Sequence, residues 1–154
     1  MSNVGDLSIV VSPFQPADFE RWLPLWRGYQ SFYRTDIPPE TTEITWRRMM
    51  DPAEPMWGAL ARVGGTPAGM VHWIFHRSNW TIGDYCYLQD LFVDAGVRRG
   101  GVGRALIEHV YEEAHRARSP RVYWLTHETH AEAMMLYDRV ADRSGFIQYR
   151  KVVS

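Results

Sequence analysis

The sequence from Leu91 to Leu106, LFVDAGVRRGGVGRAL, decides the fold because it runs from an apolar strand through a basic, glycine-rich loop directly into a helix. Glycines lack Cβ atoms, so a ligand can approach the backbone closely and unusual backbone angles cost little. The helix that follows begins with unpaired N–H groups and a partial positive charge, which together attract an anion. Arginines add full charges and forked donors that suit phosphate. The segment therefore predicts a cradle for a pyrophosphate. Its expected members are Arg98, Arg99, Gly100, Gly101, Gly103 and Arg104.

Hydrophobic spacing on either side of this segment predicts the order of the other elements. We expect a strand at 7–12, helices beginning near 16 and 41, a hairpin of strands at 57–63 and 67–77, a strand at 85–93, a helix at 102–116, a strand at 121–126, a helix at 131–143 and a closing strand at 145–152. This order predicts a mixed α/β (α+β) fold, with a mainly antiparallel central sheet flanked by about four helices.

The bulk composition limits the class of protein. A chain of 154 residues with 45% hydrophobic residues is expected to form one folded domain, residues 1–154. A net charge of −1 argues against a general binder of nucleic acid or of membrane surfaces. The single cysteine, Cys86, excludes an internal disulfide, and no stretch approaches the roughly 20 apolar residues of a membrane span. We therefore expect a soluble, cytoplasmic protein.

Two familiar phosphate motifs do not fit the glycine loop. A P-loop would continue from its glycine into Lys and Ser or Thr, whereas Gly103 is followed by Arg104 and Ala105. The dinucleotide fingerprint needs a third small residue where Leu106 stands, and it follows the first strand of a parallel sheet.

Three ordered segments instead resemble the GNAT superfamily of N-acetyltransferases. Arg98-x-x-Gly101-x-Gly103, after a strand ending in Val93, is similar to the coenzyme A signature of that family. The segment 126–137, THETHAEAMMLY, resembles its second cofactor segment, and Ser144-Gly145-Phe146 resembles the Gly-Phe that usually follows. The strands at 87–93 and 123–126 look most like the branch of small histone and polyamine acetyltransferases.

The resemblance implies that acetyl-CoA binds with its pyrophosphate on the amides of 99–104 and its pantetheine arm along the backbone of 91–93. His130 stands where the family usually has an Asn that contacts the pantetheine. The cofactor-binding residues expected from the resemblance are Leu91, Phe92, Val93, Arg98, Arg99, Gly100, Gly101, Val102, Gly103, Arg104, His130 and Tyr137.

The resemblance also implies direct attack of a primary amine on the thioester, without a covalent intermediate. The amide near Leu91 would donate to the thioester oxygen, which becomes an oxyanion. Tyr137 matches the family tyrosine that protonates the departing thiolate, and a phenol of pKa about 10 carries the necessary proton at pH 7. Cys86 is expected to be a buried strand residue and not a nucleophile.

The general base is less well defined, because Tyr87 and Gln89 occupy the places where some family members have a Glu. Strict alternation points Asp90 to the opposite face from Gln89, and only a bulge would change that. The expected order of preference is a water chain to solvent, then Glu128, Asp90 and His127.

An aromatic, mildly acidic pocket for a cationic acceptor could form from Tyr29, Tyr33, Asp36 and Trp80, although the same aromatic residues could instead form a core face under the sheet. No Cys/His cluster has zinc spacing, so no metal is expected. The sequence thus predicts an N-acetyltransferase of a small amine or amino acid. The alternatives are a protein lysine or N-terminal acetyltransferase, and a non-catalytic acyl-CoA-binding regulatory module. Family analogy suggests a homodimer.

Overall fold

The computed structural model describes residues 8–97 and 100–154, in one unit that ends at Trp124 and a second that begins at Leu125. The predictions made for Arg98 and Arg99, and for the start of the first strand at residue 7, lie outside the described residues.

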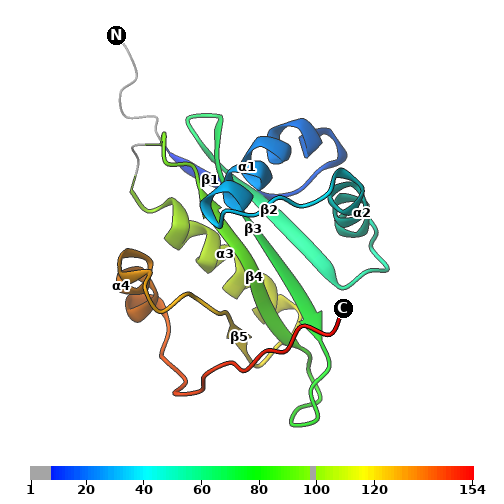
Figure 1. Ribbon diagram of the computed structural model, residues 1–154, viewed down its shortest axis with the longest axis vertical. Helices are drawn as coiled ribbons and strands as arrows, with labels where there is room; N and C mark the ends of the chain where they lie inside the picture. The colour runs from blue at the N-terminus through cyan, green and yellow to red at the C-terminus, as the bar shows by residue number, and fades with distance from the viewer. Residues whose placement is uncertain (1–7, 98–99) are drawn as a thin grey trace. The chain divides into compact units, whose positions relative to one another are not determined.

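The first unit is built on a five-stranded sheet, counted over the described residues, with the order β1-β2-β3-β4-β5 (Figure 1). Its strands are β1 (Ile9–Pro13), β2 (Met56–Val63), β3 (Thr66–His76), β4 (Tyr85–Val93) and β5 (Val122–Tyr123). Neighbouring strands are antiparallel except β4 and β5, which are parallel. β2 and β3 form the predicted hairpin through Gly64 and Gly65, both at positive φ.

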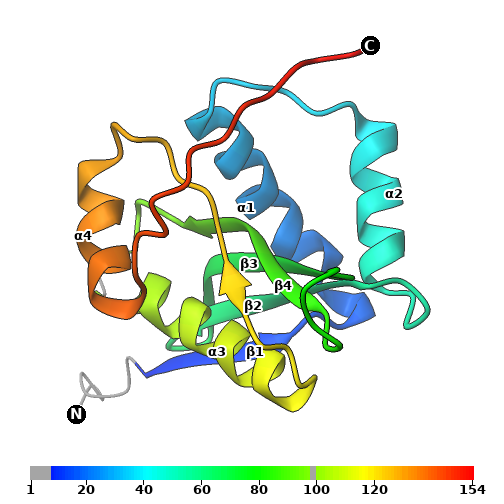
Figure 2. The ribbon, with the colours of Figure 1, turned by 90° about the horizontal axis from the view of Figure 1, so that it is seen from below.

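Helices cover both faces of this sheet (Figure 2). α1 (Phe19–Phe32), which follows a short 3-10 turn at Pro16–Asp18, lies with α2 (Pro39–Met49) on one face, and α3 (Val102–Arg116) lies on the other. The aromatic core of the α1 face includes Trp22 and Trp26. The α3 face buries a helical stripe of aliphatic residues: Val102, Leu106, Val110 and Ala114.

The second unit contains α4 (Ala131–Val140) and, among its described residues, no strand. The closing strand predicted at 145–152 is therefore wrong. Its apolar side chains alternate as in a strand, but Phe146 is 91% and Tyr149 is 91% exposed, and no ladder pairs their backbone. The strand predicted at 121–126 is only two residues long, and the helix predicted to reach residue 143 ends at Val140 because Ala141 is extended.

The fold class predicted from the sequence is confirmed: the described residues form a mixed α/β arrangement, with a mostly antiparallel sheet and four α-helices. Both β4 and α3 have the predicted bounds. None of the described helices is long and apolar enough to cross a membrane.

α3 packs closely on β3 and β4 because Gly69 leaves room for it. A Cβ at Gly69 would lie 2.8 Å from the carbonyl oxygen of Phe92 and 3.1 Å from a methyl carbon of Leu106. The backbone oxygen cannot move aside without disturbing the β3–β4 ladder.

We predict that Gly69→Ala lowers the free energy of unfolding by about 1–3 kcal/mol through overpacking. Gly100→Ala is the control, because a Cβ there meets no atom within 4 Å. Urea unfolding followed by circular dichroism measures both, and equal stabilities for the two variants would contradict the close packing.

Candidate acyl-transfer site

A bulge in β4 determines which of its side chains face α1. His72 pairs with Asp90 but Trp73 pairs with Leu88, so the register skips Gln89, which is exposed. Residues that pair across a ladder point to the same face, and so do residues two apart in one strand. His72 and Ile74 share a face, and their respective partners, Asp90 and Tyr87, therefore share it too. From the sequence, only a bulge could change the face to which Asp90 points. The structure contains that bulge.

Asp90 lies among hydroxyl and imidazole groups on the α1 face. His72 Nδ1 is 2.9 Å from Asp90 Oδ2, and the carboxylate side chain keeps 14% of its surface exposed. Tyr29 of α1 is hydrogen-bonded to the same carboxylate, and the Tyr33 hydroxyl is hydrogen-bonded to Tyr29. A carboxylate only accepts hydrogen bonds. The single Tyr29 proton therefore goes to Asp90.

Three tyrosines around Asp90 hold their protons more tightly than a free phenol does. Burial raises the pKa of Tyr29, Tyr33 and Tyr87, and the negative charge of Asp90 raises each further. All three therefore stay neutral near pH 7. The Tyr87 ring also stacks on Tyr123 of β5, with centroids 5.0 Å apart. The result is a half-buried carboxylate surrounded by aromatic rings, an arrangement that favours an organic cation.

Beyond the bulge, one edge of β4 has no strand partner among the described residues. Pairing with β5 ends at Tyr87 in the described ladder. On the opposite edge, the Asp94 N–H donates to the Ala68 carbonyl at 2.8 Å. Every second residue of an antiparallel ladder faces its partner strand, so Leu91 and Val93 direct their N–H and C=O groups away from β3. The structure thus provides the extended edge expected at 91–93.

The N-terminus of α3 provides a second set of free donors. Gly101, the N-cap, has φ 94°, a left-handed conformation that favours glycine. The first intrahelical bond runs from the Ala105 N–H to the Gly101 carbonyl at 2.9 Å, so the amides of 102–104 have no acceptor within the helix. The first turn contains no acidic residue. The Arg104 guanidinium binds Glu108 at 2.9 Å, so its charge is partly neutralised.

These two sets of donors fit coenzyme A. Both follow the bulge, and only eight positions of sequence, 94–101, separate them along the chain. The backbone edge suits the amide-rich pantetheine arm, and the helix N-terminus suits the pyrophosphate. In the same strand, burial raises the pKa of the Cys86 thiol to about 12, which agrees with its expected lack of reactivity.

The predicted acceptor residues do not all come together. Tyr29 and Tyr33 lie with Asp90, as described above. Asp36 is exposed in the connection between α1 and α2. Trp80 is 90% exposed in the β3–β4 loop, beyond the pair His76–Tyr85. The ladder thus separates Trp80 from Asp90, which pairs with His72 four residues back along β3.

Sequence reasoning did not connect Trp22, His72 and Tyr87 with Asp90. No role was predicted for His72, and the described residues contain no group of three or more His, Cys, Asp or Glu side chains able to hold a metal. The missing signal was cross-strand pairing, which no local pattern reveals.

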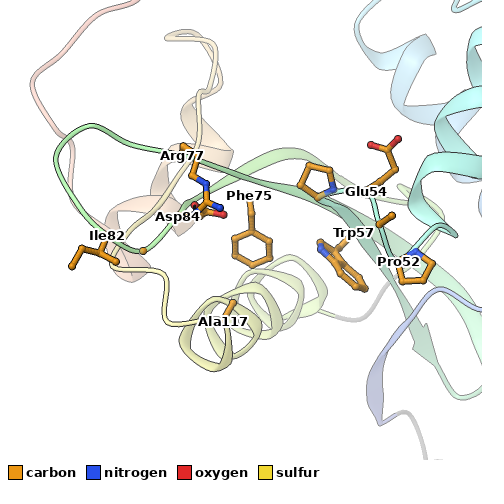
Figure 3. Close-up of a pocket in the computed structure, with 11 residues that line it drawn as sticks. Pro52, Glu54, Trp57, Phe75, Arg77, Ile82, Asp84 and Ala117 are labelled. Atoms are coloured by element: carbon orange, nitrogen blue, oxygen red, sulfur yellow. Dashed lines mark hydrogen bonds and ion pairs between the residues drawn. The ribbon is translucent and has the colours of Figure 1, made fainter.

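A separate cavity of about 430 Å³ lies near the C-terminal end of α3, lined by Trp57, Phe75, Ile82 and Ala117 among others (Figure 3). Its Arg77 and Asp84 pair with one another at 3.2 Å. α3 has 15 residues and is about 22 Å long, so this cavity is about one helix length from the free amides of 102–104. It is not part of the site described above.

The remaining predicted residues belong to the second unit, 125–154. Glu128 is exposed, and the His127 ring accepts hydrogen bonds from the amide and hydroxyl of Thr129. His130 is the N-cap of α4, and its ring lies 5.8 Å from that of His127. Tyr137 is half-buried on α4.

Comparison with known proteins identifies the family. The model of the acetyltransferase (GNAT) family matches residues 19–141. The chain belongs to the GNAT family. Members of this family use acetyl-CoA.

Named relatives include acetyltransferases of small molecules. The GNAT chain is 39% identical to the D-amino-acid N-acetyltransferase HPA3 of Saccharomyces cerevisiae over 145 residues, which cover 93% of this chain and 90% of that protein. It is 32% identical to the thialysine N-epsilon-acetyltransferase of Caenorhabditis elegans over 83 residues, 54% of this chain and 51% of that one.

Among solved structures, AAC(6')-Iy in complex with the bisubstrate analog CoA-S-monomethyl-acetylneamine superposes with a TM-score of 0.80 at 15% identity, over 95% of this chain and 99% of that one. At this low identity the match supports the fold alone.

Proposed function

We propose that this protein transfers the acetyl group of acetyl-CoA to the primary amine of a small amine or an amino acid. The observation that carries the proposal is the Asp90 carboxylate, held among tyrosines on the strand whose edge is open for a pantetheine arm. Similarity to a D-amino-acid N-acetyltransferase over 93% of the chain supports an acceptor of this size.

Asp90 receives the acceptor in this proposal. An amine arrives at neutral pH as an ammonium ion, which the carboxylate attracts and which the faces of Tyr29, Tyr33 and Tyr87 stabilise. His72 and Tyr29 occupy some of the hydrogen-bond acceptor positions of the Asp90 carboxylate. The remaining lone pairs accept a proton from the ammonium and release a nucleophilic amine. Because the bulge places Asp90 among the tyrosines, Asp90 is preferred to Glu128 and His127 as the proposed general base.

Leu91 and Tyr137 act on the other reacting atoms. Acetyl-CoA supplies a thioester as the activated acyl donor. The Leu91 N–H, which points away from β3, donates to the oxygen that becomes negative during acyl transfer. The Tyr137 hydroxyl supplies a proton to the departing sulfur. This role is supported by the resemblance of 126–137 to the second cofactor segment of the family, in which His130 takes the pantetheine contact.

Three further expectations from the sequence remain proposals: a single domain over 1–154, a cytoplasmic location and a homodimer. Light scattering of the purified chain would measure the oligomeric state.

The first test is release of free CoA with a panel of D- and L-amino acids, diamines and lysine-containing peptides. We expect turnover with small amines. Binding of acetyl-CoA without turnover on any acceptor would favour the regulatory module, and turnover on peptides alone would favour the protein acetyltransferase.

Asp90→Asn should lower kcat/KM for the amine by about 10²–10⁴-fold, because an amide accepts no proton at neutral pH. Affinity for acetyl-CoA should be unchanged in isothermal titration calorimetry. Asp84→Asn removes a carboxylate at the other end of β4 and serves as the control. Unchanged turnover in Asp90→Asn would contradict its role as base.

Tyr137→Phe should lower kcat by about 10²-fold or more, because the leaving sulfur loses its proton donor. Acetyl-CoA affinity should change little, since the ring is retained. Equal losses of turnover and of affinity would contradict the general-acid role and indicate a binding role.

Gly103→Asp should abolish acetyl-CoA binding, because a carboxylate in the first turn of α3 would fill the cradle and repel phosphate. Asn79→Asp adds the same charge in the β3–β4 loop and should bind normally. Retained affinity in Gly103→Asp, measured by calorimetry, would rule out the helix N-terminus as the pyrophosphate site.

A further inference from the structure

A buried histidine lies behind Asp90. His72 is on β3, and its side chain is only 5% exposed. It contacts Asp90 through one ring nitrogen and the indole of Trp22 through the other. In the chemistry proposed above, this buried group only occupies an acceptor position of the carboxylate and takes no part in directing the proton transfer.

The partners of His72 determine which nitrogen of its ring carries the proton. Trp22 Nε1 lies 2.9 Å from His72 Nε2, and an indole N–H can only donate. Nε2 therefore carries a lone pair, which places the ring proton on Nδ1. Nδ1 lies 2.9 Å from Asp90 Oδ2. The geometry thus gives a directed chain in which Trp22 donates to His72 and His72 donates to Asp90.

The ring of His72 has little freedom to turn. It packs against Phe14, Trp22 and Trp26, with centroid separations of 5.8, 6.0 and 5.2 Å. The orientation of its Nδ1–H is thus fixed by core packing on the α1 face. Asp90 receives a second donor, Tyr29, from α1. The carboxylate is thus held from two separate elements, β3 and α1.

We infer that His72 is a positioning residue for acetyl transfer: Trp22 fixes it as the neutral Nδ1–H tautomer, and its single donor orients the Asp90 carboxylate toward the acceptor amine. The inference rests on the proposed role of Asp90 as base. Through His72, a hydrogen bond in the aromatic core controls the direction in which the base accepts a proton.

Two matched substitutions at His72 each remove one of its two hydrogen bonds, the one from Trp22 or the one to Asp90. In His72→Asn, the amide nitrogen can occupy the place of Nδ1 and donate to Asp90, while the acceptor for Trp22 is lost. In His72→Gln, the amide oxygen can occupy the place of Nε2 and accept from Trp22, while the donor to Asp90 is lost. Each variant removes one buried hydrogen bond, so similar decreases in the thermal midpoint are expected.

We expect His72→Gln to lower kcat/KM for the amine by about 10- to 100-fold, because a misdirected base abstracts the proton poorly. His72→Asn should stay within about threefold of wild type, as the loss of one neutral hydrogen bond allows. Both variants should bind acetyl-CoA as the wild type does in calorimetry. Equal activity of the two variants, or lower activity of His72→Asn, would overturn the positioning role.

Asp90→Asn in the same assay separates this inference from the proposed function. If Asp90→Asn keeps wild-type turnover, Asp90 is not the base and the role of His72 is overturned with it. If Asp90→Asn is impaired but the two His72 variants are equally active, only the role of His72 is overturned.

A measurement on the unmodified protein tests the inferred His72 tautomer even if the variants fail to fold. Nitrogen-15 NMR of the histidine rings should show the His72 proton on Nδ1 and a lone pair on Nε2. A proton on Nε2 would overturn the inference without any substitution.

Discussion

The skipped register at Gln89 is the constraint on which the site depends. Without it, the alternation of β4 would put Asp90 on the face opposite Tyr87, against α3 and away from the tyrosines of α1. The same extra residue shifts the backbone by one position, so that the amides of Leu91 and Val93, and not those of their neighbours, point to the free edge. One irregularity therefore sets both the position of the proposed base and the donors available to the thioester.

The two faces of the sheet contribute different parts of the proposed site. On the α3 face, a stripe of aliphatic residues and the close approach at Gly69 fix the helix whose N-terminus points its free amides outward. On the α1 face, aromatic rings are packed around hydrogen-bonded polar groups, such as the pair of Trp22 with His72. In the proposed reaction, the donor and acceptor substrates bind to structures with different physical requirements. A phosphate group is best bound by backbone amides, and an ammonium ion by a carboxylate with aromatic neighbours.

Much of this arrangement could be predicted from the sequence because its signals are local. The bounds of β4 and α3 follow from an apolar run, a glycine loop and a helical stripe. The bulge could not be predicted, since it is defined by pairing between His72 and Asp90, 18 residues apart. The predicted closing strand failed for a related reason. Alternation at 145–152 is a local signal, but a strand exists only where another strand pairs with it. Trp80 was grouped with Tyr29 and Tyr33 by composition alone, and the ladder separates them.

The position of Cys86 has a practical consequence for the chemistry of the whole molecule. The chain has a single thiol, its surface is fully buried in β4, and its pKa is raised to about 12. At pH 7 this buried thiol therefore stays protonated. Electrophiles and oxidants react with thiolates, so the folded protein is nearly inert to both. A reagent that detects newly released sulfhydryl groups would accordingly report the free CoA product and almost nothing from the protein itself.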